Sequence, residues 1–309
     1  MTGLGLEPNR DPAGRPEGRV RRIFCGAEGL RPGWGAALYV AMIGAMGGLT
    51  FVILHYGFHV HPNRKAPMGP GALVLNEAVA IVFTMGATLI MGRIEGRRIW
   101  RYGFGLDGAG RLYALGLAVG FPLLSLVVAV EWAAGGLHFD GVLLRGVAIP
   151  VYALWVGLGF VLVGISEEAM FRGYFFNALT RAMGFWPASL LVSALFGLSH
   201  MSNPGENPLG IANVVLASLF FCVLLRATGS LWCGMGVHAA WDWAQSFLYG
   251  VPDSSLMFKH HLLASHATGP VWLSGGKDGP EGTAISVVVL ALGTAWLALR
   301  PRAGAPASA

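Results

Sequence analysis

The segment from Val151 to Thr180 reads VYALWVGLGFVLVGISEEAMFRGYFFNALT, and its composition indicates which kind of fold this chain forms. No charged residue precedes Glu167 in it, and the only later charges are those of Glu168 and Arg172. A helix needs about 20 mainly apolar residues to cross about 30 Å of hydrocarbon, and this segment exceeds that length. It therefore predicts a membrane-spanning helix that carries ionisable groups within the lipid.

The rest of the chain is similarly apolar. Hydrophobic residues make up 54% of the 309 positions and charged residues only 12%, and the mean hydropathy is +0.59. Apolar runs between clusters of Gly, Pro and Arg predict the following spans. They cover residues 34–54, 71–92, 112–134, 151–180, 186–200, 208–225, 230–248 and 283–299. The expected fold is an all-α, polytopic membrane helix bundle with about eight transmembrane helices.

Three regions are predicted along the chain. Residues 1–33 are rich in Arg, Gly and Pro and lack the apolar core of a signal peptide, so they predict a disordered cytoplasmic tail. Residues 34–300 form the membrane domain, within which 150–248 is the expected catalytic core, and 301–309 form a C-terminal tail. The Gly- and Pro-rich segment 249–282 predicts an irregular connection that separates seven helices from a final anchor.

Arginine and lysine residues cluster in the connections on one side of the predicted spans. Arginines precede the first span and recur between residues 93 and 111, whereas the alternate connections hold fewer basic residues. This positive-inside pattern predicts that both termini are cytoplasmic. The net charge of +5 is thereby explained by membrane orientation, and no nucleic-acid partner is expected. A chain rich in Ala, Gly and Arg favours a bacterial plasma membrane.

Ionisable groups within lipid are costly, so they indicate function by default. Glu168 and Arg172 are four residues apart with the acid N-terminal, which predicts an ion pair on one helix face. Glu167 lies about 100° around the helix from Glu168 and points elsewhere. Glu77 and Glu131 lie near the predicted outer ends of their spans, where a side chain reaches the headgroups at little cost, and no function is predicted for them.

His200 ends the fifth predicted span, and its depth can be compared with that of Glu167. Residues 184–187 form the evident turn between the two helices. Both side chains then lie on the order of 20 Å of helix from that turn, at similar depth and able to face each other.

The seventh span carries His238 and Asp242, which are four residues apart and share a helix face. Counted from Ser230, His238 lies about 12 Å into its helix. Gly116 and Gly120 in the third span are small residues at the same spacing, and they predict a close contact with another helix. The spans that carry Glu167, His200 and His238 together predict one polar pocket, to which three helices contribute.

Such a pocket can activate water in two ways. Glu167 beside a neutral imidazole can act as a general base. Glu167, His200 and His238 would equally supply the ligands of a zinc ion, or of another divalent metal, with one open position. The alternative is a purely structural role, in which these groups pair with one another and hold the helices together.

Three ordered motifs resemble those of the CPBP or Abi intramembrane proteases. They are Glu167-Glu168-Ala-Met-Phe-Arg172, Phe196-Gly-Leu-Ser-His200 and His238-Ala-Ala-Trp-Asp242. This family includes the eukaryotic Ras-converting CAAX prenyl endopeptidase and bacterial immunity-type homologues. The resemblance covers residues 150–248. It implies an endopeptidase of the membrane that cleaves a membrane-associated protein or peptide.

The resemblance also implies roles for individual residues. Glu167 would be the water-activating base with His200 beside it, supported by the Glu168–Arg172 pair, while His238 and residue 242 would hold the oxyanion. The family usually has Asn where this chain has Asp242, and an ionised Asp cannot donate a hydrogen bond. Asp242 is therefore expected to be protonated, to orient His238, or to help bind a metal.

Two other classes of function share these features. A noncatalytic membrane scaffold, such as a bacteriocin-immunity-type protein, would keep the bundle and bind a partner. A proton-coupled transporter would use the intramembrane acids as a relay, but the chain lacks the inverted repeats and paired broken helices of such folds.

Overall fold

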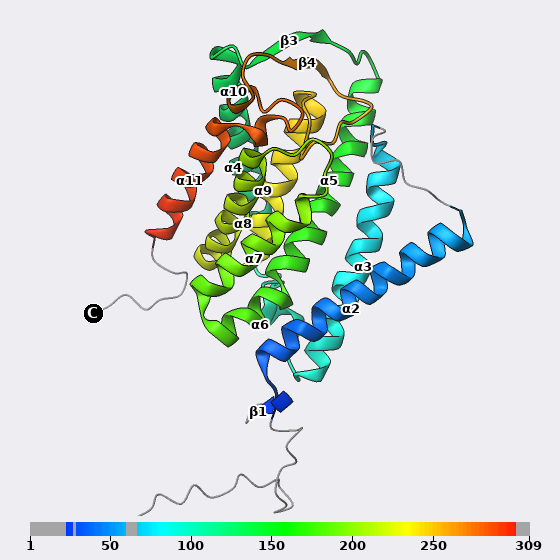
Figure 1. The fold of residues 1–309 in the computed structure, drawn as a ribbon, viewed down its shortest axis with the longest axis vertical. Coiled ribbons are helices and arrows are strands. Elements are labelled where there is room, and N and C mark those ends of the chain that lie inside the picture. Colours follow the sequence, from blue (N-terminus) through cyan, green and yellow to red (C-terminus); the bar gives the residue numbers. More distant parts are fainter. Residues whose placement is uncertain (1–22, 27–28, 60–66, 301–309) are drawn as a thin grey trace, which may run out of the picture.

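Each predicted span coincides with a helical segment of the computed structural model, which describes residues 23–26, 29–59 and 67–300 (Figure 1). The segments are α2 (Pro32–Val52) with its π-helical continuation η1 (Ile53–Gly57), α3 (Pro70–Ile94), α4 (Ala109–Ala133), α5 (Ala148–Arg172) with α6 (Tyr174–Met183), α7 (Phe185–His200), α8 (Pro208–Thr228), α9 (Leu231–Trp243) with its continuation η3 (Ala244–Leu248), and α11 (Ala284–Ala298). The all-α bundle is confirmed. Most of the predicted tails, 1–22, 27–28 and 301–309, lie outside the described residues.

Five of these segments are long and apolar enough to cross a membrane, within the part of the chain that the structure describes. They are α2 with η1, α3, α4, α5 with α6, and α8. Helices α7 and α11 are apolar but shorter. A polytopic membrane bundle is therefore confirmed, whereas the number of about eight transmembrane helices stays a prediction.

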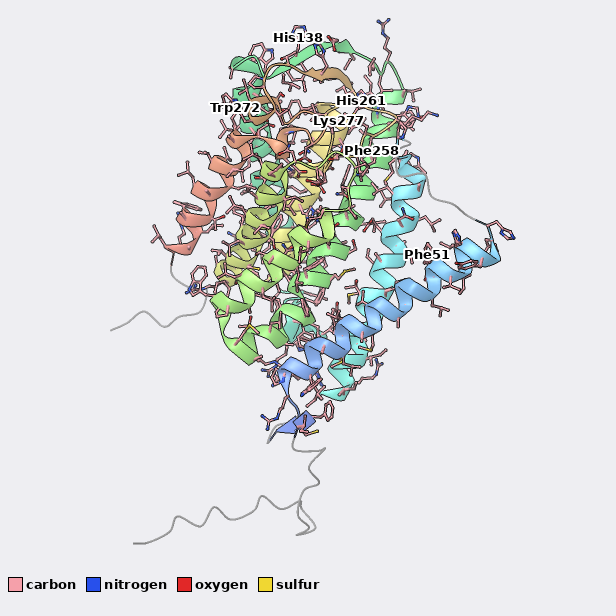
Figure 2. All side chains as sticks on the ribbon, viewed as in Figure 1. Phe51, His138, Phe258, His261, Trp272 and Lys277 are labelled. Carbon is pink, nitrogen blue, oxygen red and sulfur yellow. The ribbon has the colours of Figure 1, made fainter. Side chains whose placement is uncertain are left out.

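Large apolar side chains cover the outside of the bundle. Leu154, Val82 and Leu292 are 74%, 67% and 66% exposed. Phe51 is also exposed, on the half of α2 that extends away from the other helices (Figure 2). Soluble proteins rarely expose apolar surface on this scale, so these faces contact lipid and the chain is an integral membrane protein.

The prediction of a single helix over 151–180 is wrong in one respect, because the helix breaks at Gly173. There the backbone turns to φ −75° and ψ −121°. A Cβ at this position would lie 2.3 Å from the carbonyl oxygen of Ala169, so the turn depends on glycine. Helix α6 then starts in a new direction and packs against α2 and α7.

Helix α9 packs at the centre of the bundle against α4, α5 and α8. A Cβ on Gly116 would lie 2.2 Å from the carbonyl oxygen of Cys233, and one on Gly120 would lie 2.3 Å from that of Val237. The close contact predicted from these two glycines is therefore confirmed, and α9 is the partner helix. The contact fixes the backbone immediately before His238.

The connection 249–282 folds over one end of the bundle (Figure 1). Its strand β4 (Leu263–Ala267) pairs antiparallel with β3 (Leu137–Val142), from Leu137 opposite Ala267 to Val142 opposite Leu263, with a register shift between Phe139 and Gly141. The short helices α10 (Val271–Ser274) and η4 (Pro280–Gly282) lead on to α11. The remaining short elements are β1 (Cys25–Gly26), β2 (Gly29–Leu30) and η2 (Ile99–Tyr102).

The last helix is part of the bundle. Helix α11 packs along α8, and its Leu290 is buried in a core cluster with Phe220 of α8 and Val237 of α9. The prediction of a final anchor separated from seven helices is therefore wrong. The residues 249–282 are also more ordered than predicted, since they carry a paired strand and two helical turns.

Candidate active site

The predicted ion pair between Glu168 and Arg172 lies fully inside the bundle. Arg172 Nη1 donates to Glu168 Oε1 over 3.3 Å, and the exposed fractions of the two side chains are 0% and 2%. The guanidinium lies 4.4 Å from the ring centroid of Phe196 and 5.4 Å from that of Phe221. A buried guanidinium is stabilised by such aromatic faces as well as by its carboxylate partner.

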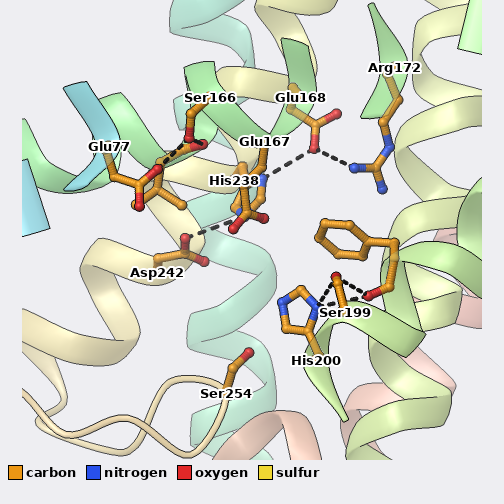
Figure 3. A network of polar contacts seen from close by, with 12 residues as sticks. Glu77, Ser166, Glu167, Glu168, Arg172, Ser199, His200, His238, Asp242 and Ser254 are labelled. Atoms are coloured by element: carbon orange, nitrogen blue, oxygen red, sulfur yellow. Dashed lines mark hydrogen bonds and ion pairs between the residues drawn. The ribbon is translucent and has the colours of Figure 1, made fainter. Parts of the chain in front are cut away.

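Glu168 also holds the imidazole of His238. His238 Nδ1 lies 3.2 Å from the same oxygen, Glu168 Oε1, and must donate to it because a carboxylate only accepts (Figure 3). The His238 ring stacks on Phe221, with centroids 5.2 Å apart and an angle of 17° between the planes. These contacts fix the ring so that its other nitrogen, Nε2, faces away from Glu168.

Two carboxylates flank His238 Nε2. Glu167 Oε2 lies 3.7 Å from it and Asp242 Oδ2 lies 3.5 Å from it. Glu167 has no arginine partner among the described residues, and its side chain keeps 30% of its surface exposed. The two adjacent glutamates therefore differ as their helix positions predict: Glu168 is committed to the ion pair, and Glu167 is available to a ligand.

His200 ends α7 on another side of the site. Its Nδ1 lies 2.9 Å from the carbonyl oxygen of Phe196 and donates to it, so Nε2 is left as the acceptor. Figure 3 shows the His200 ring apart from Glu167 and His238, with no interaction drawn between them. The three side chains nevertheless line one cavity of about 390 Å³.

That cavity brings together the four residues predicted to be catalytic, Glu167, His200, His238 and Asp242. They come from α5, α7 and α9, as the sequence predicts. A water molecule takes up roughly 30 Å³ in the liquid, so the cavity has room for several waters or for a segment of substrate. Phe258, which also lines it, lies at the end of the bundle where the connection 249–282 folds over (Figure 2).

The break at Gly173 corrects the depth argument for Glu167. Since α6 turns away, Glu167 lies only 173 − 167 = 6 residues from the end of its straight helix, about 9 Å. His238 lies 238 − 230 = 8 residues after the N-cap Ser230, about 12 Å. Glu167 and His238 are therefore the closely matched pair, and His200 reaches the cavity from the far end of α7.

Several residues that line the cavity were not predicted. Glu77 of α3 accepts a hydrogen bond from Ser166, beside Glu167, and does not reach toward the headgroups. The connection 249–282 contributes Asp253, Ser254 and Glu281 to the lining. A carboxylate in an apolar span was the signal for Glu77, whereas loop residues carried no comparable signal. Glu131, also predicted to reach the headgroups, is buried at 1% exposure and lies outside this lining.

The zinc ligands predicted from the sequence do not converge in this arrangement. His200 Nδ1 is taken up by a carbonyl and His238 Nδ1 by Glu168, which leaves one nitrogen on each ring. Within the described ranges, three donors come within 4.8 Å of one another at Asp242, Asp253 and Glu281 and not at Glu167, His200 and His238. Zinc binding by those two rings and Glu167 would require their donor atoms to come closer together, and it stays a prediction.

A second pair of carboxyls, Glu206 and Asp278, lies on the connections outside the cavity lining. Burial raises the pKa of Glu206 to about 8 and that of Asp278 to about 6, and the charge of Glu281 adds to both effects. The charge of Asp278 also raises the pKa of Glu206, because the two carboxyls repel each other when both are ionised. Such a pair keeps its proton at a pH where an exposed carboxyl is ionised.

We expect the protein to lose stability as the pH rises from about 5 through about 8. The folded state binds the Glu206 proton more tightly than the unfolded state does, so the stabilisation is present at low pH and is lost as the pH passes the folded pKa. Glu206→Gln should raise the unfolding temperature in detergent at about pH 8.5 and leave it nearly unchanged at about pH 5. The exposed Asp107→Asn is the control, and equal behaviour of the two variants would contradict the prediction.

The comparisons with known proteins agree with the motifs. Residues 149–244, from the start of α5 to the end of α9, match the family model of the type II CAAX prenyl endopeptidase Rce1-like proteins. Neither a curated protein nor a solved structure gives a significant match to the chain. The resemblance to the CPBP or Abi proteases is thereby confirmed over this region. The matched residues 149–244 make up about a third of the chain.

Proposed function

We propose that the chain is an intramembrane endopeptidase that hydrolyses a peptide bond of a membrane-associated protein or peptide. The observation that carries the proposal is a single cavity, lined from three helices by Glu167, His200 and His238, within a region that matches a protease family. A carboxylate and two imidazoles in one enclosed space are the groups that general acid–base hydrolysis requires.

Glu167 acts as the general base. It takes a proton from a water in the cavity, and the oxygen of that water adds to the carbonyl carbon of the substrate. The carbon–nitrogen bond then breaks, and the proton on Glu167 passes to the leaving amine. Glu167 suits this role because its carboxylate faces the cavity and is not held by Arg172, in contrast to Glu168.

His238 stabilises the oxyanion that develops on the carbonyl oxygen. Its doubly protonated ring donates Nδ1–H to Glu168 and directs Nε2–H into the cavity, where a preorganised donor is most effective. The Glu168–Arg172 pair and the stacked Phe221 hold the ring in this orientation. Asp242 helps to orient His238 from the Nε2 side, since an ionised Asp242 cannot itself donate to the oxyanion.

His200 positions the attacking water. With its Nδ1–H bonded to the carbonyl of Phe196, its Nε2 accepts a hydrogen bond from a group in the cavity. The water would then lie between two acceptors, His200 and Glu167, which orients its lone pair toward the substrate carbonyl. The catalysis proposed is therefore of the glutamate type.

The cavity walls indicate the class of substrate. Leu73, Phe160, Phe258 and Leu290 line it with the polar groups, so an apolar or lipid-bearing peptide segment fits beside the catalytic residues. The matched family is named for cleaving prenylated CAAX sequences, and we propose the broader class of membrane-associated peptides for this chain. We further propose a bacterial plasma membrane, with both termini cytoplasmic, from the distribution of arginines.

Mass spectrometry of peptides released from membranes tests this function. Membranes that contain the wild-type protein should release a set of peptides that membranes with Glu167→Ala do not release, and a chelator selective for zinc over calcium should leave the set unchanged. Equal peptide sets from both membranes would contradict the proposal. If Glu167→Ala also restored the physiological role in cells, a noncatalytic scaffold would be the better account.

A further inference from the structure

Three carboxylates that hydrolysis does not require as a group meet at the covered end of the cavity. One oxygen each from Asp242, Asp253 and Glu281 lies within 4.8 Å of the other two. Asp242 belongs to α9, one turn after His238, whereas the other two belong to the connection 249–282. No lysine or arginine of the described residues lines this cavity, and the cationic group beside the cluster is His238, whose Nε2 lies 3.5 Å from Asp242 Oδ2 and offsets only one of the three negative charges.

The two carboxylates of the connection are held in place by serines. Ser246 Oγ donates to Asp253 Oδ2 over 3.0 Å. Ser254 donates to Glu281 Oε2 from both its backbone nitrogen and its Oγ, each over 2.9 Å. Since each carboxylate is fixed through one oxygen, the other oxygen remains for a ligand. The neutral serine donors add no positive charge beside Asp253 and Glu281.

This concentration of charge is unfavourable without a counterion. Such repulsion is relieved either by a proton or by a bound cation, and a cation relieves all three carboxylates together.

An independent observation on α8 points to a ligand in the same cavity. Asn213 is only 2% exposed and lines this cavity, and its amide oxygen Oδ1 has no hydrogen-bond partner in the part of the chain that the structure describes. A buried acceptor without a partner costs about 1–3 kcal/mol, so such groups are normally satisfied. The amide oxygen is therefore a hard oxygen donor of this cavity that has no protein partner among the described residues.

We propose that Asp242, Asp253 and Glu281, with the amide oxygen of Asn213, bind a calcium ion. Calcium takes oxygen ligands at about 2.3–2.6 Å, so two ligands on opposite sides of it lie up to about 5 Å apart. The three carboxylate oxygens all lie within 4.8 Å of one another, which is inside that limit. Zinc prefers nitrogen and sulfur and shorter bonds, and magnesium demands a tighter octahedron.

The ion fastens the connection 249–282 to α9. It joins Asp253 and Glu281 of the connection to Asp242, so binding closes the covered end of the cavity next to His238. This site is separate from the catalytic use of Glu167, and its occupancy can be measured without any cleavage assay.

Thermal unfolding of the purified full-length protein in detergent, after removal of divalent ions, tests the site. Millimolar Ca²⁺ should raise the unfolding temperature of the wild type more than Mg²⁺ does. Glu281→Gln and Asp253→Asn should each weaken the apparent Ca²⁺ affinity by about 10- to 100-fold or more. Even the loss of a residue that only hydrogen-bonds to a metal ligand weakens metal binding by about that factor. Asp140→Asn, an exposed acid of β3, should keep the wild-type response.

Terbium luminescence gives a second readout. Trp241 lines the same cavity, so Tb³⁺ bound there should emit when tryptophan is excited, and Ca²⁺ should displace it. The absence of Ca²⁺-displaceable emission in the wild type would overturn the proposal, even if a variant failed to fold. So would an equal calcium response in Glu281→Gln and Asp140→Asn. Glu167→Gln should still bind Ca²⁺, which separates a failure of this site from a failure of the proposed protease.

Discussion

Replacing Glu167 by glutamine is expected to slow peptide-bond cleavage by about 10²- to 10⁴-fold, the range that a general base contributes. Glutamine keeps the size of the side chain and its place in the cavity, but it cannot take a proton from water. The rate should be measured in lipid nanodiscs on a peptide identified by mass spectrometry. Membrane insertion and the unfolding temperature should stay close to those of the wild type, because Glu167 supports no ion pair with arginine.

Glu131→Gln is the matched control for this variant. Glu131 is another buried glutamate of the bundle, on α4, but it does not line the cavity. Its replacement should leave the cleavage rate within about twofold, because it removes no catalytic group. A Glu167→Gln protein that cleaves as fast as Glu131→Gln would refute the assigned base.

Replacing Arg172 by methionine is expected to destabilise the fold by about 3–5 kcal/mol, the cost of breaking a buried ion pair from one side. The change leaves the Glu168 carboxylate inside the bundle with His238 as its remaining partner. Because Glu168 orients His238, cleavage should fall as well. Unfolding in detergent, followed by circular dichroism, measures the first effect, and the nanodisc assay measures the second.

A double variant distinguishes the ion pair from simple packing. Glu168→Gln combined with Arg172→Met removes both charges, so it should recover much of the stability that Arg172→Met loses. Arg226→Met is the control for loss of an arginine, since Arg226 lies near the end of α8 against Phe185 and Trp186. If the double variant were less stable than Arg172→Met alone, the charge argument would be wrong.

The sequence predicted which side chains meet at the cavity because the information that places them is local. Glu168 and Arg172, like His238 and Asp242, are four residues apart, and a helix places such pairs on one face whatever surrounds them. The Gly116 and Gly120 pair likewise marked a helix contact that the structure places against α9. Apolar length alone located each helical segment, since lipid leaves few other options for the backbone.

The break at Gly173 was not predictable in the same way. Glycine occurs within many membrane helices, and only the surrounding helices decide whether the chain turns there. The buried face of α6, which includes Tyr174 and Phe175, gains its contacts by turning toward α2 and α7. The depth estimate for Glu167 assumed a straight helix and was therefore too large.

The loop carboxylates that line the cavity could also not be predicted from the sequence. Asp253 and Glu281 lie in a Gly- and Pro-rich connection with no periodicity, where charged residues are ordinary. Their approach to Asp242 depends on the pairing of β4 with β3 and on the packing of α11 against α8. Glu77 is an acid within the predicted span 71–92, but we expected it to lie close enough to the outer end of the span to reach the headgroups.

The most direct test of the central claim is an experimental structure of the protein in lipid nanodiscs, at a resolution that shows ordered water. We predict that the side chains of Glu167, His200 and His238 face one cavity within the bilayer, with a water in contact with Glu167. Side chains that face separate surfaces, or a dry and closed space between α5, α7 and α9, would contradict it.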